Sequence, residues 1–340
     1  MLTIRLTRLI VLGACVGRLA ARPPMITPAM RVESTCSTEH GFWRHTTRGA
    51  TPLHHIHVAF FDNRQNPDTE SMLRAAKLIQ TSAHPVRFHA MLSVTRDLPG
   101  IQVHRIQLPP FAQCLHKYLA SSAHGPGPQY MYKLFTPWIL PRHVPRVILL
   151  DTDIAVLGSI QELWNLFDHF NGALIGLANE QNALYAPLTG KNGGVQLYDL
   201  DGIRASDHYL HVMATFNVNG YRLGYLGDQT YYTILNHLHP KLVYQVSCAW
   251  NRQLNTHFGI GDERFSRCDE GCSLLHANHA PVKCVVQQLQ ARGNISCAAW
   301  RDFVERPECL TMEVGPRRSF QGALRRFFSS CCRHGDSAPR

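Results

Sequence analysis

The sequence predicts an α/β fold, with a single Rossmann-like domain whose mostly parallel central sheet is flanked by helices. Short apolar segments of strand length alternate along the chain with segments whose apolar residues recur at helical spacing. One apolar segment, residues 147–150, ends directly on Asp151 and Asp153, as expected at the carboxyl edge of a sheet, where ligands bind. The chain has 340 residues, of which 45% are hydrophobic, enough to bury a full core.

The predicted elements follow one another in order. The expected strands are residues 55–63, 86–94, 100–109 and 146–151, and the expected helices are residues 68–84, 130–140 and a helix that begins near 159. The helix over 68–84 is favoured because apolar residues such as Met72, Ala76 and Ile79 recur at helical spacing. Strands that are separated by helices usually pair in parallel, so this order predicts the sheet.

The charge of the chain is concentrated at its two ends. Of the formal net charge of +10, residues 1–33 carry five arginines against one glutamate, and residues 316–340 carry six arginines against one aspartate. The nearly neutral body lacks the continuous basic face that follows a phosphate backbone. We therefore expect no nucleic-acid partner.

Three regions are expected along the chain. Residues 1–33 resemble a signal or anchor segment, because basic residues precede the apolar stretch of residues 9–17. This stretch is too short to span a membrane. An arginine-rich start is also found in organellar import signals. Residues 34–315 form the globular domain, and 316–340 a basic, disordered tail that could also contact an anionic membrane. Eleven cysteines and the glycosylation sequon at Asn294 favour the secretory pathway.

The pair Asp151 and Asp153 is the first candidate site. Two carboxylates one residue apart at a strand end can bind the same hard divalent cation. A general acid and base pair, or a simple cap on the following helix, are the alternatives for this short motif.

The surroundings of this pair resemble glycosyltransferase family 8, the retaining nucleotide-sugar transferases with a single GT-A type domain. Among its members, the sequence is most similar to the xylosyltransferase domain of the LARGE glycan-synthesising enzymes. The similar blocks, in order, are residues 132–141, 143–167, 171–181, 191–204, 226–236, 245–257 and 274–283, within a similar region of about residues 55–290. The LARGE enzymes carry a second transferase domain, for which this chain is too short.

The resemblance implies a metal-dependent retaining transferase in the Golgi lumen. The donor is a UDP-sugar, with UDP-xylose as the first expectation, and the acceptor is a glycan or another hydroxyl. Manganese is implied, bound by Asp151, Asp153 and His276. A rival interpretation of His276 is a zinc site with Cys268, Cys272 and His279, although the short spacing argues against it.

Further roles follow from the same resemblance. The implied donor-binding residues are Lys133, Asp151, Asn192, Gly193, Gly194 and Lys283, and the implied catalytic residues are Asp228 and Gln229. Because glutamine is a poor nucleophile, a front-face route is favoured. The alternatives are a solvated helix residue for Lys133, a helix N-cap for Asp228 and a surface lysine for Lys283, whose spacing from the histidine differs from the family's by one residue.

The resemblance also implies a disulfide between Cys248 and Cys268. Two other functions remain open from the sequence. One is a catalytically silent relative that binds a nucleotide or a glycan, and the other is a zinc-stabilised interaction module centred on residues 268–279.

Overall fold

The computed structural model describes residues 55–79, 85–181, 190–216, 223–224, 226–253, 268, 270 and 272–277. The expected targeting segment, the basic tail, the sequon, His279 and Lys283 lie outside these residues. Within the described part of the chain, no helix is long and apolar enough to cross a membrane.

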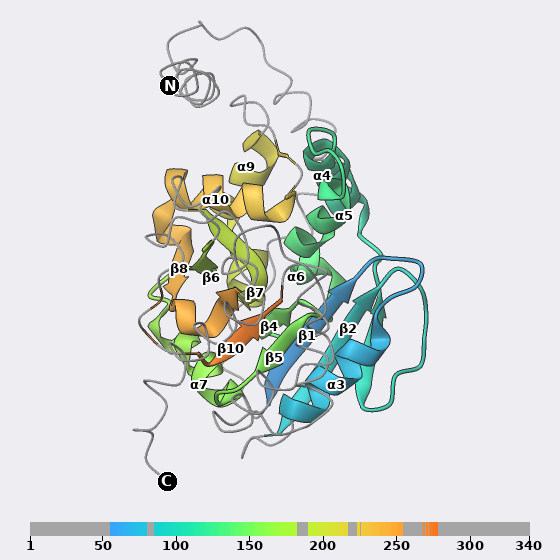
Figure 1. Cartoon of the computed structure of the whole chain (residues 1–340). Coiled ribbons are helices and arrows are strands. Elements are labelled where there is room, and N and C mark those ends of the chain that lie inside the picture. The colour runs from blue at the N-terminus through green and yellow to red at the C-terminus, as the bar shows by residue number, and fades with distance from the viewer. Residues whose placement is uncertain are drawn as a thin grey trace, which may run out of the picture.

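A seven-stranded sheet forms the centre of the molecule (Figure 1). Its strands, in spatial order, are β3 (Ile101–Arg105), β2 (Val86–Leu92), β1 (Ile56–Asp62), β4 (Arg146–Leu150), β7 (Lys191–Asp199), β6 (Ile175–Asn179) and β8 (Val243–Val246). β3, β2, β1 and β4 are parallel to one another, β6 is parallel to β8, and β7 is antiparallel to both of its neighbours. The mostly parallel sheet expected from the sequence is confirmed.

The reversed direction of β7 matters for the site. Because β7 is antiparallel to β4, its first residues lie beside the carboxyl end of β4, where Leu150 pairs with Val195. The backbone N–H of Asp151 extends this pairing by donating to the carbonyl of Gly194 at 2.9 Å. The block that begins at Lys191 is therefore brought next to the two aspartates.

A second, three-stranded sheet lies at the same edge. It consists of β5 (Ile154–Val156), β10 (Leu274–His276) and β9 (Arg252–Gln253), with β10 between the other two. β10 pairs antiparallel with β5, so that His276 faces Ile154, and parallel with β9. In Figure 1, β10 (orange) lies directly beside β5 (green).

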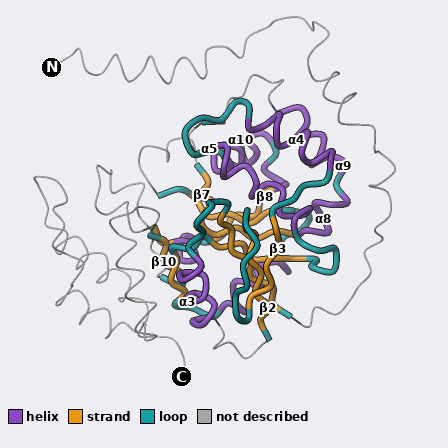
Figure 2. The backbone as a smooth tube through the Cα atoms, turned by 90° about the vertical axis from the view of Figure 1, so that its right-hand side faces the viewer, coloured by secondary structure: helices purple, strands orange, loops and turns teal. Residues whose placement is uncertain are grey.

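Helices pack against both faces of the large sheet (Figure 2). One face packs against α3 (Thr69–Ile79), α7 (Ile160–Asn165) and η3 (Leu166–His169); the other packs against α4 (Pro110–Ala120), η2 (Met131–Phe135), α6 (Thr136–Ile139), α8 (Leu200–Ala205), α9 (Asp207–Thr215) and α10 (Asp228–Leu238). Short elements α5 (Gly127–Tyr130), η6 (Pro240–Leu242) and η7 (Cys248–Asn251) connect these parts. Alternate residues of β1 enter the two cores, Val58 and Phe60 on one side and Ala59 and Phe61 on the other.

Two helical segments differ from the sequence prediction. The helix expected over residues 130–140 is divided into the end of α5, η2 and α6. Pro137 has no N–H, and the Thr136 hydroxyl donates to the Lys133 carbonyl at 2.8 Å. Helix α4 was not predicted, although its buried residues Phe111, Leu115 and Leu119 recur at helical spacing.

Three histidines, His57 and His89 buried and His104 half-buried, form a hydrogen-bonded row across β1, β2 and β3. His57 Nδ1 lies 2.9 Å from His89 Nε2, and His89 Nδ1 lies 3.0 Å from His104 Nε2. Burial, reinforced for His57 by the positive charge of Arg87, lowers the pKa of His57 to about 4, and burial next to His57 lowers the pKa of His89 to about 3. These imidazoles are therefore neutral in the folded protein.

This row predicts a loss of stability in mild acid. In the unfolded chain His57 and His89 take up protons near their ordinary pKa, but in the folded protein they do so only near pH 4 and below. Their contribution is therefore complete above about pH 6.5 and is lost as the pH falls towards 4. Urea unfolding should show a smaller pH dependence for His89→Gln than for the wild type, whereas His169→Gln, at an exposed position, should match the wild type. Equal pH dependence in all three proteins would contradict the prediction.

Candidate functional site

The two aspartates follow a strand that is buried on both faces. Residues 147–150 of β4 are at most 1% exposed, whereas Asp151 and Asp153 are partly accessible at the carboxyl edge of the sheet. β5 begins immediately after them, at Ile154. The short connection between the two sheets therefore holds both carboxylates at one edge.

His276 completes a group of three possible metal ligands with these aspartates. Its Nε2 lies 3.5 Å from Asp153 Oδ1 and 3.8 Å from Asp151 Oδ2, and one ligand atom from each residue lies within 4.8 Å of the others. These separations are too long for hydrogen bonds but suit three ligands around one ion. His276 Nδ1 is 3.1 Å from Asn251 Oδ1, so Nε2 is the ring nitrogen that faces the carboxylates. Two carboxylates and an imidazole fit a divalent cation.

Gly194 provides the space for the His276 ring. A Cβ at this position would lie 2.2 Å from His276 Cε1 and 2.4 Å from Nδ1. We expected the glycines of this block to allow the backbone close to a donor sugar. The structure shows a further use of Gly194, because the imidazole lies directly against its backbone. The expected approach of this block to a donor sugar stays a prediction.

Lys133 is a buried cation at the centre of the site. From η2, its Nζ donates to Asp151 Oδ1 at 2.5 Å and to the Gly193 carbonyl at 3.1 Å, and it lies 4.0 Å from Asp228 Oδ2. Burial lowers the pKa of Lys133, but the carboxylates of Asp151 and Asp228 outweigh this effect and raise it. With 3% of its surface exposed, the residue is not the solvated helix lysine that was one interpretation of the sequence.

Asp228 is the first residue of α10 and is buried against β7. Its Oδ2 accepts a hydrogen bond from Gln196 Nε2 at 3.0 Å. Burial, opposed by the nearby Lys133 ammonium, raises the pKa of Asp228 to about 6. The N-cap of α10 is Gly227, not Asp228, so the capping alternative is wrong.

Gly227 allows the sharp turn that places Asp228. Its φ is +54°, and a Cβ there would lie 2.2 Å from the carbonyl oxygen of Gly127. A side chain at this position would therefore be both strained and obstructed.

Gln229 and Asn192 are joined through Glu180, a residue that the sequence analysis missed. Glu180 Oε2 accepts from Gln229 Nε2 at 2.5 Å and from Asn192 Nδ2 at 2.9 Å. Gln229 Oε1 is 3.4 Å from the backbone nitrogen of Gly193. The available signal was an acidic residue separated by one position from the apolar strand segment of residues 175–178, at the same edge as Asp151.

Among the described residues, the predicted site residues lie together. This holds for Lys133, Asp151, Asp153, Asn192, Gly193, Gly194, Asp228, Gln229 and His276. Lys283 lies outside the described residues, and its expected phosphate contact stays a prediction.

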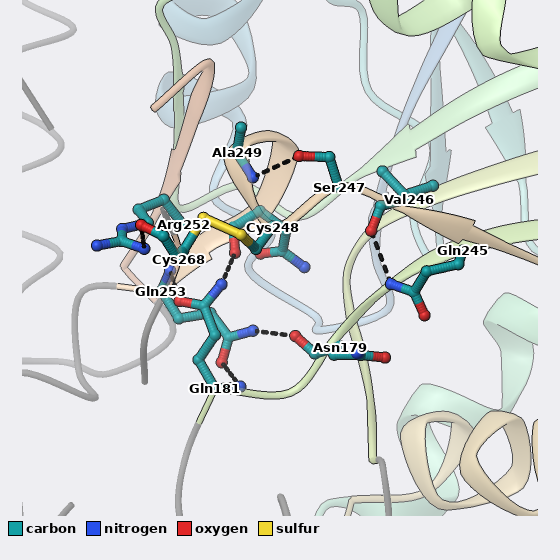
Figure 3. The surroundings of a disulfide bond; sticks show 11 residues. Asn179, Gln181, Gln245, Val246, Ser247, Cys248, Ala249, Arg252, Gln253 and Cys268 are labelled. Atoms are coloured by element: carbon teal, nitrogen blue, oxygen red, sulfur yellow. Dashed lines mark hydrogen bonds between the residues drawn. A yellow bond between two sulfur atoms is a disulfide. The ribbon is translucent and has the colours of Figure 1, made fainter. Parts of the chain in front are cut away.

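The expected disulfide is present and bears on the zinc alternative. Cys248 and Cys268 are bonded, with their Cα atoms 5.8 Å apart (Figure 3). Cys272 is disulfide-bonded as well. Neither Cys268 nor Cys272 is therefore a thiolate that could bind zinc in this structure, and the proposed zinc module loses two of its four ligands.

The disulfide also supports the segment that carries Asn251. It connects η7 to Cys268, and Arg252 donates to the Cys268 carbonyl at 2.9 Å. On the other side, the amides of Gln181 and Gln253 bond to each other's backbone N–H groups at 3.1 Å. These contacts, visible in Figure 3, fix the segment beside the end of β6.

Lys133→Met should destabilise the protein. The substitution leaves the buried carboxylate of Asp228 and the partly accessible carboxylate of Asp151 without their shared cation, which typically costs about 3 kcal/mol of unfolding free energy. Urea unfolding without added metal measures this cost. Lys117→Met, at an exposed position of α4, serves as the matched control and should unfold like the wild type. An unchanged free energy of unfolding in Lys133→Met would show that the ion pairs of Lys133 do not stabilise the protein as expected.

The sequence is similar to known glycosyltransferases. It is 31% identical over 206 residues to xyloside xylosyltransferase 1 of Mus musculus, covering 50% of this chain and 52% of that protein. It is 34% identical over 171 residues to the xylosyl- and glucuronyltransferase LARGE1 of Homo sapiens, covering 46% of this chain and 22% of that protein. No protein-family model matches the chain. The resemblance expected from the sequence is confirmed by these relatives.

The fold has a counterpart among solved structures. The crystal structure of mouse xyloside xylosyltransferase 1 in its apo form aligns with a TM-score of 0.53 at 21% identity, covering 66% of this chain and 98% of that one. This alignment confirms the GT-A type fold. The chain spans about half the length of the xyloside xylosyltransferases that it matches and a smaller share of LARGE1.

Proposed function

We propose that this protein is a divalent-cation-dependent retaining glycosyltransferase that transfers a sugar from a UDP-sugar to a hydroxyl group of a glycan. The observation that carries the proposal is the convergence of Asp151, Asp153 and His276 next to Asp228 and Gln229 at one sheet edge. The similar proteins are glycosyltransferases, and the names of several include xylose transfer. UDP-xylose is therefore the first donor to test.

We assign the cation-binding role to Asp151, Asp153 and His276, with manganese as the proposed ion because an imidazole beside carboxylates suits it better than magnesium. When bound, the cation supplies Lewis acidity that stabilises the negative charge developing on the departing diphosphate. The proposed role of Lys133 is to hold Asp151 in position through its hydrogen bond, and that of Lys283 is to contact a phosphate.

In the proposed reaction, Asp228 binds sugar hydroxyls and Gln229 faces the anomeric carbon. The bond from the anomeric carbon to the phosphate oxygen breaks, and its electron pair leaves with the phosphate. The acceptor oxygen then bonds to the same face of the sugar and gives its proton to the departing phosphate oxygen. The carbonyl oxygen of Gln229 stabilises the positive charge on the sugar without becoming a nucleophile.

The wider setting is also a proposal. We place the protein in the secretory pathway, with residues 1–33 as a targeting segment, 34–315 as the transferase domain and 316–340 as a basic tail. The disulfides at Cys248 and Cys272 agree with an oxidising compartment.

The direct test is UDP release from a panel of UDP-sugars by the purified full chain, with and without Mn²⁺. Cation-dependent release from one donor is expected and identifies the sugar. Cation-dependent binding of UDP without release, even with glycan acceptors present, would instead support a silent nucleotide-binding relative. Failure to bind UDP in any condition would overturn the proposal.

A further inference from the structure

A chain of buried amide groups connects Glu180 to His276. Asn192 Nδ2 donates to Glu180 Oε2 at 2.9 Å, and Asn251 Nδ2 donates to Asn192 Oδ1 at 2.8 Å. The oxygen of Asn251 then lies 3.1 Å from His276 Nδ1. All four side chains are at most 5% exposed, so water has little access to replace these contacts.

The direction of every hydrogen bond in this chain follows from its first member. A carboxylate only accepts, so the NH₂ group of Asn192 must face Glu180 and its oxygen must face Asn251. The backbone N–H of Gly194 agrees, because it donates to the same Asn192 oxygen at 2.9 Å. The oxygen of Asn251 is then the group that faces the His276 ring.

This order determines the tautomer of His276. Because Asn251 presents an oxygen, the ring nitrogen that faces it, Nδ1, must carry the hydrogen. Nε2 is then left with a lone pair directed at Asp151 and Asp153. Only this tautomer can act as a metal ligand through Nε2.

The same oxygen of Glu180 also orients Gln229. Gln229 Nε2 donates to it at 2.5 Å, so the amide oxygen of Gln229 is turned towards the Gly193 N–H. One carboxylate thus fixes two amides, one leading to the metal ligands and the other belonging to the proposed catalytic residue.

We infer that Glu180 is a positioning residue that sets both the His276 tautomer and the direction of the Gln229 amide. The part that concerns Gln229 rests on the proposed function. The part that concerns His276 requires only that the Asp-Asp-His group binds a cation, and it is tested without any substrate.

The test compares Glu180→Leu, which removes the acceptor at similar size, with Glu180→Gln, which keeps an acceptor oxygen. Calorimetry with Mn²⁺ should show at least about a tenfold loss of affinity in Glu180→Leu, as is typical for partners of metal-bound histidines, and recovery of most of it in Glu180→Gln. Nitrogen NMR of the metal-free wild type should show His276 protonated at Nδ1, and Glu180→Leu should show a share of the other tautomer. Asn179→Ala is the matched control. Asn179 is next to Glu180 in sequence but takes no part in the hydrogen bonds from Glu180 to His276, so this variant should bind Mn²⁺ like the wild type.

Two results would overturn the inference: unchanged Mn²⁺ affinity in Glu180→Leu, or protonation of His276 at Nε2 in the wild type. If Glu180→Leu does not fold, Asn251→Leu replaces it, since this variant removes the oxygen that faces Nδ1. In an active enzyme, Glu180→Leu should also lower kcat more than it raises the donor KM. If no UDP-sugar is turned over by the wild type, the proposed function fails, while the affinity and the tautomer still decide the role of Glu180.

Discussion

Asp153→Asn is expected to lower cation-dependent sugar transfer at least about 1000-fold, equivalent to about 4 kcal/mol of transition-state stabilisation. Asparagine has the same shape as aspartate but lacks its charge, so the fold should persist while the proposed cation loses an anionic ligand. The oxygen affected is the one 3.5 Å from His276 Nε2. Asp151→Asn is a less selective test, because it also replaces the anionic partner of Lys133 with a neutral amide.

The measurement is kcat with the preferred UDP-sugar, together with Mn²⁺ affinity by calorimetry. The matched control is Asp168→Asn. Asp168 has a side chain that is 74% exposed and a 3.5 Å contact with Arg146 away from the site. Its variant should retain both activity and Mn²⁺ affinity. Wild-type turnover by Asp153→Asn would show that the Asp-Asp-His group does not hold the catalytic cation.

Gly194→Ala is expected to weaken Mn²⁺ binding at least about 100-fold. The new methyl group would lie 2.2 Å from His276 Cε1, and Gly194 belongs to β7 in the interior of the sheet, where the backbone has little freedom to move. The imidazole is therefore the group that must shift, and Nε2 moves away from the two carboxylates. Sugar transfer should fall in parallel.

A control must separate the general effect of adding a methyl group to a packed interior from the specific displacement of the His276 ligand in Gly194→Ala. Gly176→Ala is the matched control, because on the neighbouring strand β6 its Cβ would lie 3.0 Å from the Phe170 ring, a contact outside the metal group. This variant should lose some stability but keep its Mn²⁺ affinity. If both alanine variants bind Mn²⁺ equally well, the space provided by Gly194 is not needed for the His276 ligand.

The sequence was enough to find the residues of the candidate site, but not the contacts between distant elements that hold them in place. Asp151 and Asp153 could be found because a buried strand rarely ends on two charges, and the order of similar blocks indicated His276. The packing of Gly194 against His276, by contrast, depends on β7 and β10 meeting in space. Local spacing carries no information about such a contact.

The same limit explains the remaining differences in the fold. Alternating strands and helices predicted a parallel sheet, but nothing local in residues 191–199 shows that β7 runs antiparallel to its neighbours. Glu180 looked like an ordinary acidic residue after a strand. Its importance became visible only when Gln229 and Asn192, from two other elements, were found on the same oxygen.

The three-stranded sheet also has a consequence for how the protein folds during its synthesis. Asp153 and His276 lie on or beside paired strands but are roughly 120 residues apart in sequence, so the pairing closes a long loop. During synthesis, β4 and β5 leave the ribosome long before β10, and the three ligand groups meet only when nearly all of the described chain has emerged. An ion that binds all three groups then favours, by mass action, molecules in which β10 has paired with β5 over those in which it has not. Under the proposed function, the cation would thus stabilise the same pairing of β5 with β10 that assembles its binding group.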